Sequence, residues 1–250
     1  MGDADVLISA GHLRQVGTEI LEAVGTGHED AVAVAGSLVR ADLRGHEAHG
    51  VRRLPGYVRA VREGGVDPTA APESERPSPG TVVVYGNRAF GQLAAAHAVR
   101  ELCVVAAQQG SGVAVIRDPA HVGRLGEYVA ALADLGLVAM AFGSAASLAW
   151  AVPRGTGQPP VVLDRTDHAD PGLGLLTGLA GGLAGTGMVL QAVDIAALDL
   201  PERFREQVER LCRERGTVPG DREERAARER ERAGIPLPRR TWEELTALRG

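Results

Sequence analysis

Short apolar runs alternate with longer helical patterns from Thr81 to Phe142, and this alternation constrains the fold more than any other feature of the chain. Three runs have the length and apolar content of buried strands: residues 82–85, 112–116 and 138–142. Two stretches have helical spacing: residues 90–109 and 123–135. Strands joined by helices indicate an α/β unit, and apolar runs at 161–163 and 188–193 add two expected strands to it.

The segments on either side of this unit have a different character. Residues 1–66 contain amphipathic patterns ended by glycines, which predict an N-terminal helical unit. Residues 67–80 are rich in Pro, Ser and Glu and predict an exposed connector, so that 67–200 form a shortened α/β core. Residues 201–250 are dense in Glu and Arg at helical spacing, and we expect these charged helices to pack back on the N-terminal unit. Their charged faces are either solvated or an oligomer contact.

Composition excludes several classes of function. The 250 residues carry a formal net charge of −5, so no basic field favours nucleic acid or an anionic membrane. No apolar run reaches the roughly 18 residues of a membrane span, and the N-terminus lacks the positive start of a secretory signal. The two cysteines are far apart, as expected for a cytoplasmic protein. The sequence contains no Lys, so any carboxylate must be bound by Arg, His or backbone amides.

A histidine lies at the turn between the second expected strand and the helix that follows it. His121 belongs to the run 118–124 and comes directly after the strand at 112–116. Ligands of open α/β sheets collect at the carboxyl ends of strands, and His exchanges protons near neutral pH. His121 is therefore a candidate proton-transfer residue. The alternative is a polar turn residue that caps a helix.

A second polar loop, residues 46–50, carries two histidines and is followed by Arg52 and Arg53. One of these arginines can offer a bidentate fork to a carboxylate. His46 and His49 have no third or fourth ligand nearby in the sequence, so no metal site is expected. His49 is instead a candidate proton carrier or hydrogen-bond donor to a substrate.

Several motifs of the chain occur in the same order and spacing in one enzyme family. They are Ala41-Asp42-Leu43-Arg44-Gly45, Glu47-Ala48-His49-Gly50-Val51, Arg53-Leu54-Pro55 with Tyr57, Gly91-Gln92, Ala120-His121-Val122-Gly123, Gly126 with Tyr128, Gly234-Ile235-Pro236-Leu237 and Thr241-Trp242. On these residues the chain resembles the malate/L-lactate dehydrogenase family, which also holds ureidoglycolate and sulfolactate dehydrogenases and Δ1-piperideine-2-carboxylate reductases. The resemblance covers residues 9–150 well and 187–250 less closely.

The resemblance implies a fold, an assembly and a set of roles. It implies a sheet-and-helix α/β core of that family's own type rather than a Rossmann sheet, and a homodimer with its cleft near the subunit interface. His121 resembles the family's acid/base, Arg53 its substrate-carboxylate arginine and His49 a second histidine of the cleft. Three further side chains are candidates for contacting the substrate: Tyr57, Arg124 and Glu127.

The chain departs from the family where the cofactor is held. A glycine-threonine-asparagine-proline loop expected after residue 150 and a later glycine-histidine-lysine-glycine loop are both missing from the sequence. Residues 153–184 stand where a much longer stretch belongs, so a truncated cofactor region is expected. Ala48 and Ala120 also replace the family's Ser and Asn beside the two histidines.

These features predict a divergent, His-centred acid/base enzyme that works without a nicotinamide cofactor. It would act as a tautomerase, lyase or cyclase on a small keto or imino substrate bearing a carboxylate. The alternative is an NAD(P)-dependent oxidoreductase that reduces a 2-keto acid or a cyclic imino acid. A second alternative is a non-catalytic partner subunit. The expected partners are a small carboxylate and a second copy of the chain, and neither nucleic acid nor a membrane.

Overall fold

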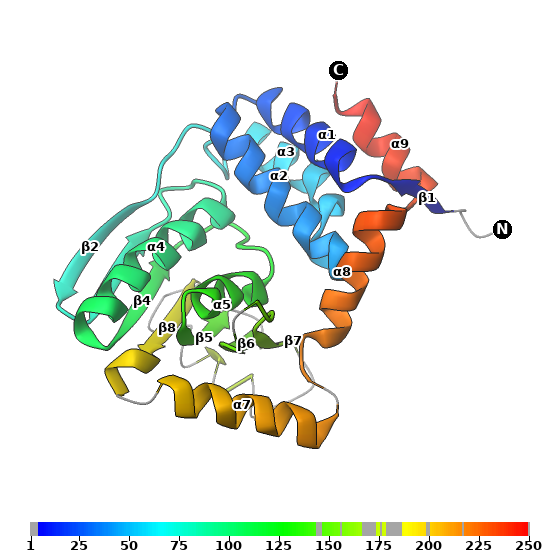
Figure 1. Ribbon diagram of the computed structural model, residues 1–250. Helices are drawn as coiled ribbons and strands as arrows, with labels where there is room; N and C mark the ends of the chain where they lie inside the picture. The colour runs from blue at the N-terminus through cyan, green and yellow to red at the C-terminus, as the bar shows by residue number, and fades with distance from the viewer. Residues whose placement is uncertain are drawn as a thin grey trace.

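A seven-stranded sheet forms the centre of the molecule, with its strands in the order β2-β3-β4-β8-β5-β6-β7 (Figure 1). Neighbouring strands are antiparallel except β3 and β4, which are parallel. The strands are β2 (Glu73–Ser78), β3 (Thr81–Tyr85), β4 (Ser111–Arg117), β5 (Leu137–Gly143), β6 (Ser147–Val152), β7 (Val161–Thr166) and β8 (Met188–Asp194). The computed structural model describes residues 5–143, 147–155, 157–166, 174–175, 177–178, 187–198, 201–216 and 218–249.

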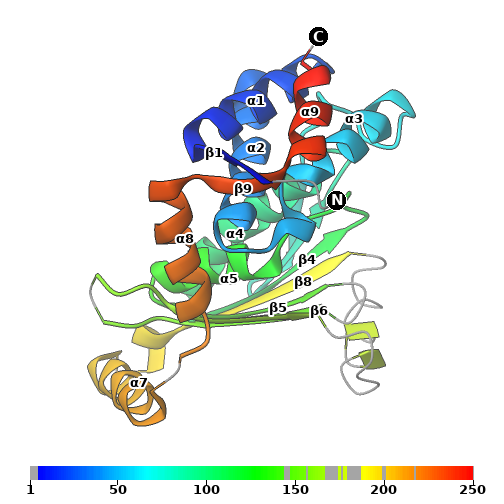
Figure 2. The same cartoon turned by 90° about the vertical axis from the view of Figure 1, so that its right-hand side faces the viewer.

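Helices α4 (Gly91–Gln109) and α5 (Leu125–Asp134) cover one face of this sheet and connect its strands (Figure 2). Helix α4 joins β3 to the parallel β4, and α5 joins β4 to β5. Strand β8 is inserted antiparallel between β4 and β5, which makes the sheet mixed. Val82, Ala114 and Leu190 are completely buried in the core of this unit. The expected α/β unit is therefore confirmed.

Three helices and two short 3-10 turns build a second core from the N-terminal part of the chain. They are α1 (Ala10–Glu22), α2 (His28–Leu43), η1 (Glu47–His49), η2 (Val51–Arg53) and α3 (Leu54–Arg62). Ser9 begins α1, because its hydroxyl accepts a hydrogen bond from the backbone N–H of His12. Phe90, which precedes α4, packs into the same apolar cluster as Leu13 and Leu54 and so joins this core to the sheet unit.

The last part of the chain returns to these N-terminal helices (Figure 2). Its elements are η3 (Ile195–Leu198), α7 (Pro201–Arg215), α8 (Asp221–Ala233), β9 (Ile235–Pro238) and α9 (Arg239–Ala247). Strand β9 pairs with β1 (Asp5–Ile8) in a separate two-stranded sheet, while α8 contacts α2 and α9 contacts α1 and α3. Helix α7 does not follow them: it lies beside η3 at the far end of the sheet unit.

The structure contains strands that the hydrophobic pattern does not indicate. Residues 73–78, expected as part of a connector, form the edge strand β2. All six of its residues are exposed, so the strand has no apolar face; it is held by backbone pairing with β3 and by polar contacts such as the ion pair of Arg76 with Glu101 on α4. Strand β9 contains Pro236 and Pro238, which are tolerated because the strand lies at an edge. No helix in the described part of the chain is long and apolar enough to cross a membrane.

Candidate active site

His121 lies in the loop between β4 and α5, at the carboxyl end of β4. Asp118, at the start of this loop, has a φ of 46°, in the left-handed region. Gly91, at the start of α4, approaches the loop so closely that a Cβ there would lie 2.3 Å from the carbonyl oxygen of Ala120. Only glycine permits this approach, so the first turn of α4 holds the His121 loop in place.

The His121 ring is held by a hydrogen-bonded chain from two other helices. Its Nδ1 lies 2.9 Å from the hydroxyl of Tyr57 on α3. Nε2 of Gln92, on α4, donates to the same hydroxyl over 2.7 Å. Tyr57 and Gln92 are both buried. Because the hydroxyl can donate to Nδ1 or accept from it, Tyr57 fits either protonation state of the ring and leaves Nε2 to meet a ligand.

Burial keeps His121, His49 and Tyr57 uncharged, and neighbouring positive charge adds to this effect at the two histidines. Burial, and then the charges of Arg53 and His49, lower the pKa of His121 to about 4. His49 stacks on His121 with the ring centroids 5.5 Å apart and the planes 16° from parallel. Burial and Arg53 also lower the pKa of His49, and burial raises the pKa of Tyr57 to about 12. All three side chains are therefore uncharged at pH 7 in the free protein.

A cavity of about 730 Å³, here called the main cavity, is lined by His49, Arg53 and His121. Nε of Arg53 donates to the carbonyl oxygen of Ala48 over 2.7 Å, which leaves its two terminal nitrogens for a carboxylate. The volume falls in the range of small-molecule sites. The rest of the described wall is small, apolar or hydroxyl-bearing, and includes Gly123, Leu125, Gly143, Ser147, Thr166 and Gly187. Among the described residues, no group of three or more His, Cys, Asp or Glu side chains could hold a metal ion.

The loop that carries His49 is fixed at both ends. The buried carboxylate of Asp42 accepts the first N–H of η2 over 2.8 Å, and Gly50 packs so tightly on it that a Cβ would overlap the carboxylate. Arg230, on α8, donates to the backbone carbonyl of Asp42 and, over 3.0 Å, to the carboxylate of Glu47. The C-terminal part of the chain therefore supports the histidine loop.

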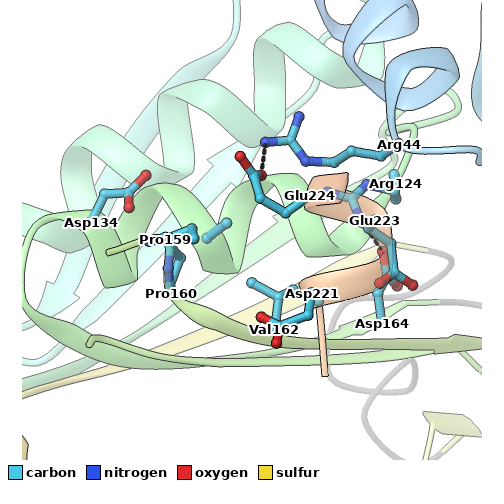
Figure 3. Close-up of a pocket in the computed structure, with 12 residues that line it drawn as sticks. Arg44, Arg124, Asp134, Pro159, Pro160, Val162, Asp164, Asp221, Glu223 and Glu224 are labelled. Carbon is cyan, nitrogen blue, oxygen red and sulfur yellow. Dashed lines mark ion pairs between the residues drawn. The ribbon is translucent and has the colours of Figure 1, made fainter. Parts of the chain in front are cut away.

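Arg124 is placed differently from His121, although only three residues separate them. Its largely buried guanidinium lies 3.5 Å from the carboxylate of Asp164 on β7. Figure 3 shows this pair beside a hollow of about 240 Å³, where Arg44 also pairs with Glu224. Arg124 also lines a hollow of about 450 Å³ that adjoins the main cavity, but it lies outside the described lining of the main cavity itself. The charge of Arg124 is matched by Asp164, and this pairing gives no support to the expected contact of Arg124 with the substrate.

Glu127 is also directed elsewhere. Its carboxylate accepts a hydrogen bond from the hydroxyl of Ser37 over 2.8 Å and pairs with Arg40 over 2.6 Å, both on α2. It lies outside the described lining of the main cavity. Glu127 therefore ties α5 to α2, and its placement gives no support to the expected contact with the substrate, which stays a prediction.

Comparison with known proteins assigns the chain to a family. A family model described as malate/L-lactate dehydrogenase matches residues 8–161, more than half of the chain. The chain belongs to the malate/L-lactate dehydrogenase family. This confirms the resemblance drawn from the motifs. The family is described by dehydrogenases, and nothing in the match supports the expected cofactor-free reaction.

Two curated relatives and one solved structure illustrate the match. The chain is 31% identical over 155 residues to a malate dehydrogenase of Pyrococcus abyssi and 35% identical over 141 residues to a Δ1-pyrroline-2-carboxylate reductase of Pseudomonas fluorescens. These matches cover 61% and 56% of this chain but 43% and 41% of the relatives, so the chain spans less than half the length of the curated relatives it matches. The structure of malate dehydrogenase from Pyrococcus horikoshii OT3 has the same fold, with a TM-score of 0.89 at 21% identity over 98% of this chain and 94% of that one.

Two residues that support the site of this family member were not identified from the sequence as functional. Gln92 belongs to the Gly91-Gln92 motif, which signals its place but not its bond to a tyrosine 35 residues away. Asp164 accepts the backbone N–H of Gly126 over 2.9 Å and so caps α5 from a distant strand. No local pattern marks Asp164. Residues 167–173 and 179–186 lie outside the described part, so the truncation of the family's cofactor region stays a prediction.

Proposed function

We propose that this chain is an NAD(P)-dependent oxidoreductase that reduces the carbonyl or imine carbon next to a carboxylate. The placement of Arg53 and His121 on one cavity carries the proposal. An arginine fork suits a carboxylate, and a histidine suits the oxygen or nitrogen atom that gains a proton. Membership of a dehydrogenase family supports the redox class.

Substrate charge and proton supply are coupled in this arrangement. In the free protein the charge of Arg53 is, after burial, the second cause of the low pKa of His121. A carboxylate on Arg53 offsets that charge, so the pKa of His121 rises toward its ordinary value when the substrate binds. Nε2 then donates to the substrate, while Tyr57 holds Nδ1.

The described wall of the main cavity fits a nicotinamide ring beside His121. Nδ1 of His49 is buried and has no hydrogen-bond partner among the described residues, so a polar group of a ligand would relieve it. Gly143 and Gly187 also line the cavity, and Thr166 offers a hydroxyl. These residues would contact the nucleotide, which supplies a hydride to the substrate carbon when bound.

We also propose that two copies associate through the sheet face opposite α4 and α5. Trp150 on β6 pairs with Leu163 on β7, and the two are 45% and 41% exposed. Met140 lies next to Trp150 on β5. A band of large apolar side chains across three strands is typical of an interface. Light scattering is expected to give the mass of a dimer, and Trp150→Glu the mass of a monomer.

The redox proposal is tested by hydride transfer. Purified protein is mixed with NADH or NADPH and a panel of 2-oxo acids and cyclic imino acids, and the absorbance of the reduced nucleotide is followed. We expect consumption that requires a carboxylate on the substrate and is lost in His121→Ala. Absence of nucleotide binding in calorimetry, together with absence of turnover across the panel, would overturn the proposal.

A further inference from the structure

A second, smaller cavity of about 250 Å³ meets the main cavity at Arg53 and His121, which line both. We call it the side pocket. It is also lined by Gly56 and Ala60 of α3, by Val66 after that helix and by Phe90 before α4. A substrate whose carboxylate lies on Arg53 and whose reacting carbon faces His121 therefore has the side pocket next to its remaining substituent.

The wall of the side pocket is apolar. Val66 and Phe90 are buried members of the N-terminal core, so they are fixed in place by packing. The one hydroxyl in the described wall belongs to Tyr57, and it is already bonded to His121 and Gln92. In the described wall, Arg53 and His121 at the junction are the only side chains that can carry positive charge.

Resting on the proposed function, we propose that the side pocket holds the substrate's side chain and selects 2-oxo acids with an apolar side chain over dicarboxylic ones. An alkyl group entering the pocket leaves water for an apolar wall, which is favourable. A second carboxylate entering it loses its hydration and finds no cation of its own, because Arg53 binds the first carboxylate and His121 faces the reacting atom. One extra or missing methylene in such a pocket changes kcat/KM by about 10- to 200-fold.

Gly56 offers a direct way to fill the pocket. A Cβ built on Gly56 meets no atom within 4 Å, so a Cβ can be added there without overlap. Gly11 of α1 is a matched control, because it is also helical and its Cβ also meets nothing within 4 Å. Gly11 lies outside the described lining of both cavities.

The test compares pyruvate, 4-methyl-2-oxopentanoate and oxaloacetate in the full chain with the reduced nucleotide. We expect kcat/KM to be at least tenfold higher for 4-methyl-2-oxopentanoate than for pyruvate, and lowest for oxaloacetate. Gly56→Leu is expected to remove the advantage of the branched acid, Gly56→Ala to reduce it, and Gly11→Leu to preserve it. A preference for oxaloacetate, or an equal loss for all three acids in Gly56→Leu, would overturn the proposal.

A binding experiment separates this inference from the redox proposal. Oxamate and N-isobutyloxamate, which resemble 2-oxo acids, are titrated into the protein by calorimetry with and without NADH. If no acid is reduced but the isobutyl compound binds at least tenfold tighter and Gly56→Leu removes that difference, the side pocket stands and the redox proposal fails. If acids are reduced without any effect of side-chain length, the redox proposal stands and the side pocket fails. Failure of both ligands to bind, with no turnover, rejects both.

Discussion

His121 and Arg124 belong to the same loop, yet they are members of two groups of opposite character. The His121 group, with Tyr57 and Gln92, is linked by neutral hydrogen bonds and leaves one ring nitrogen for a ligand. The Arg124 group is an ion pair with Asp164 that joins β7 to the start of α5. The comparison teaches that a ligand is expected where a polar group still has an atom free to form a hydrogen bond, as Nε2 of His121 does. The charge of Arg124 is already paired with Asp164, so this group stabilises the fold.

The largest effect is expected for His121→Ala. The variant loses the proposed proton donor, so kcat/KM should fall by about 10²- to 10⁴-fold, while the free energy of unfolding at pH 7 changes little. Steady-state assays and urea unfolding measure the two quantities on the same sample. An active His121→Ala variant would remove the distinction between the His121 group and the Arg124 group, and it would favour a non-catalytic role for His121.

Arg53→Ala is expected to act on substrate binding. Loss of a charge-assisted fork raises KM by roughly 10- to 100-fold with a smaller change in kcat. Arg52→Ala is the matched control, because Arg52 is an exposed neighbour that lies outside the described lining of the main cavity. Equal effects of the two variants would show that general positive charge, and not Arg53, attracts the substrate.

The low pKa of His121 predicts a pH dependence of stability. The ordinary pKa of 6.5 falls to about 4 on folding, so the unfolded chain binds a proton in this window that the folded chain does not. The contribution of neutral His121 to the free energy of unfolding is therefore intact above pH 6.5 and is lost as the pH falls toward 4. Wild type should lose on the order of 1–3 kcal/mol more than His121→Ala between these pH values. Urea unfolding of both proteins at several pH values measures this difference. If wild type and His121→Ala lose the same free energy of unfolding between pH 6.5 and 4, the low pKa of His121 is contradicted.

Asp164→Asn is expected to weaken the fold and spare the reaction. The amide cannot match the charge of Arg124, although its oxygen can still accept the N–H of Gly126, so stability should fall by about 2 kcal/mol. The value of kcat for the folded fraction should stay within a factor of about three. A loss of kcat comparable to that of His121→Ala would place Arg124 in the chemistry after all.

Glu127→Gln is expected to give the smallest effect. Its partner Arg40 is half exposed, and such pairs contribute about 1 kcal/mol or less. Thermal unfolding at low and high salt measures the contribution, which should shrink as salt is added. A large change in KM would revive a role for Glu127 at the substrate.

The sequence predicts elements whose pattern is local, and it misses contacts that join distant parts of the chain. The strand and helix on either side of His121 follow from hydrophobic period, and the motifs around Arg53 indicate its role. The ion pairs of Glu127 with Arg40 and of Arg124 with Asp164 are not predicted from the sequence, because closeness along the chain does not reveal which neighbour a side chain faces. Gln92 meets its partner 35 residues away, and strand β2 has no apolar face from which a pattern can be read.

The pairing of β9 with β1 determines which contacts can form late during synthesis of this protein. Arg230 reaches the backbone of Asp42 across 188 positions of the chain, and Ile8 pairs with Ile235. During synthesis the helices near the N-terminus leave the ribosome long before these partners exist, at a rate of roughly 5–20 residues per second. The loop that carries His49 therefore gains its final support only after Arg230 has emerged, so a nascent chain interrupted before that point has this loop without the contacts of Arg230 to Asp42 and Glu47.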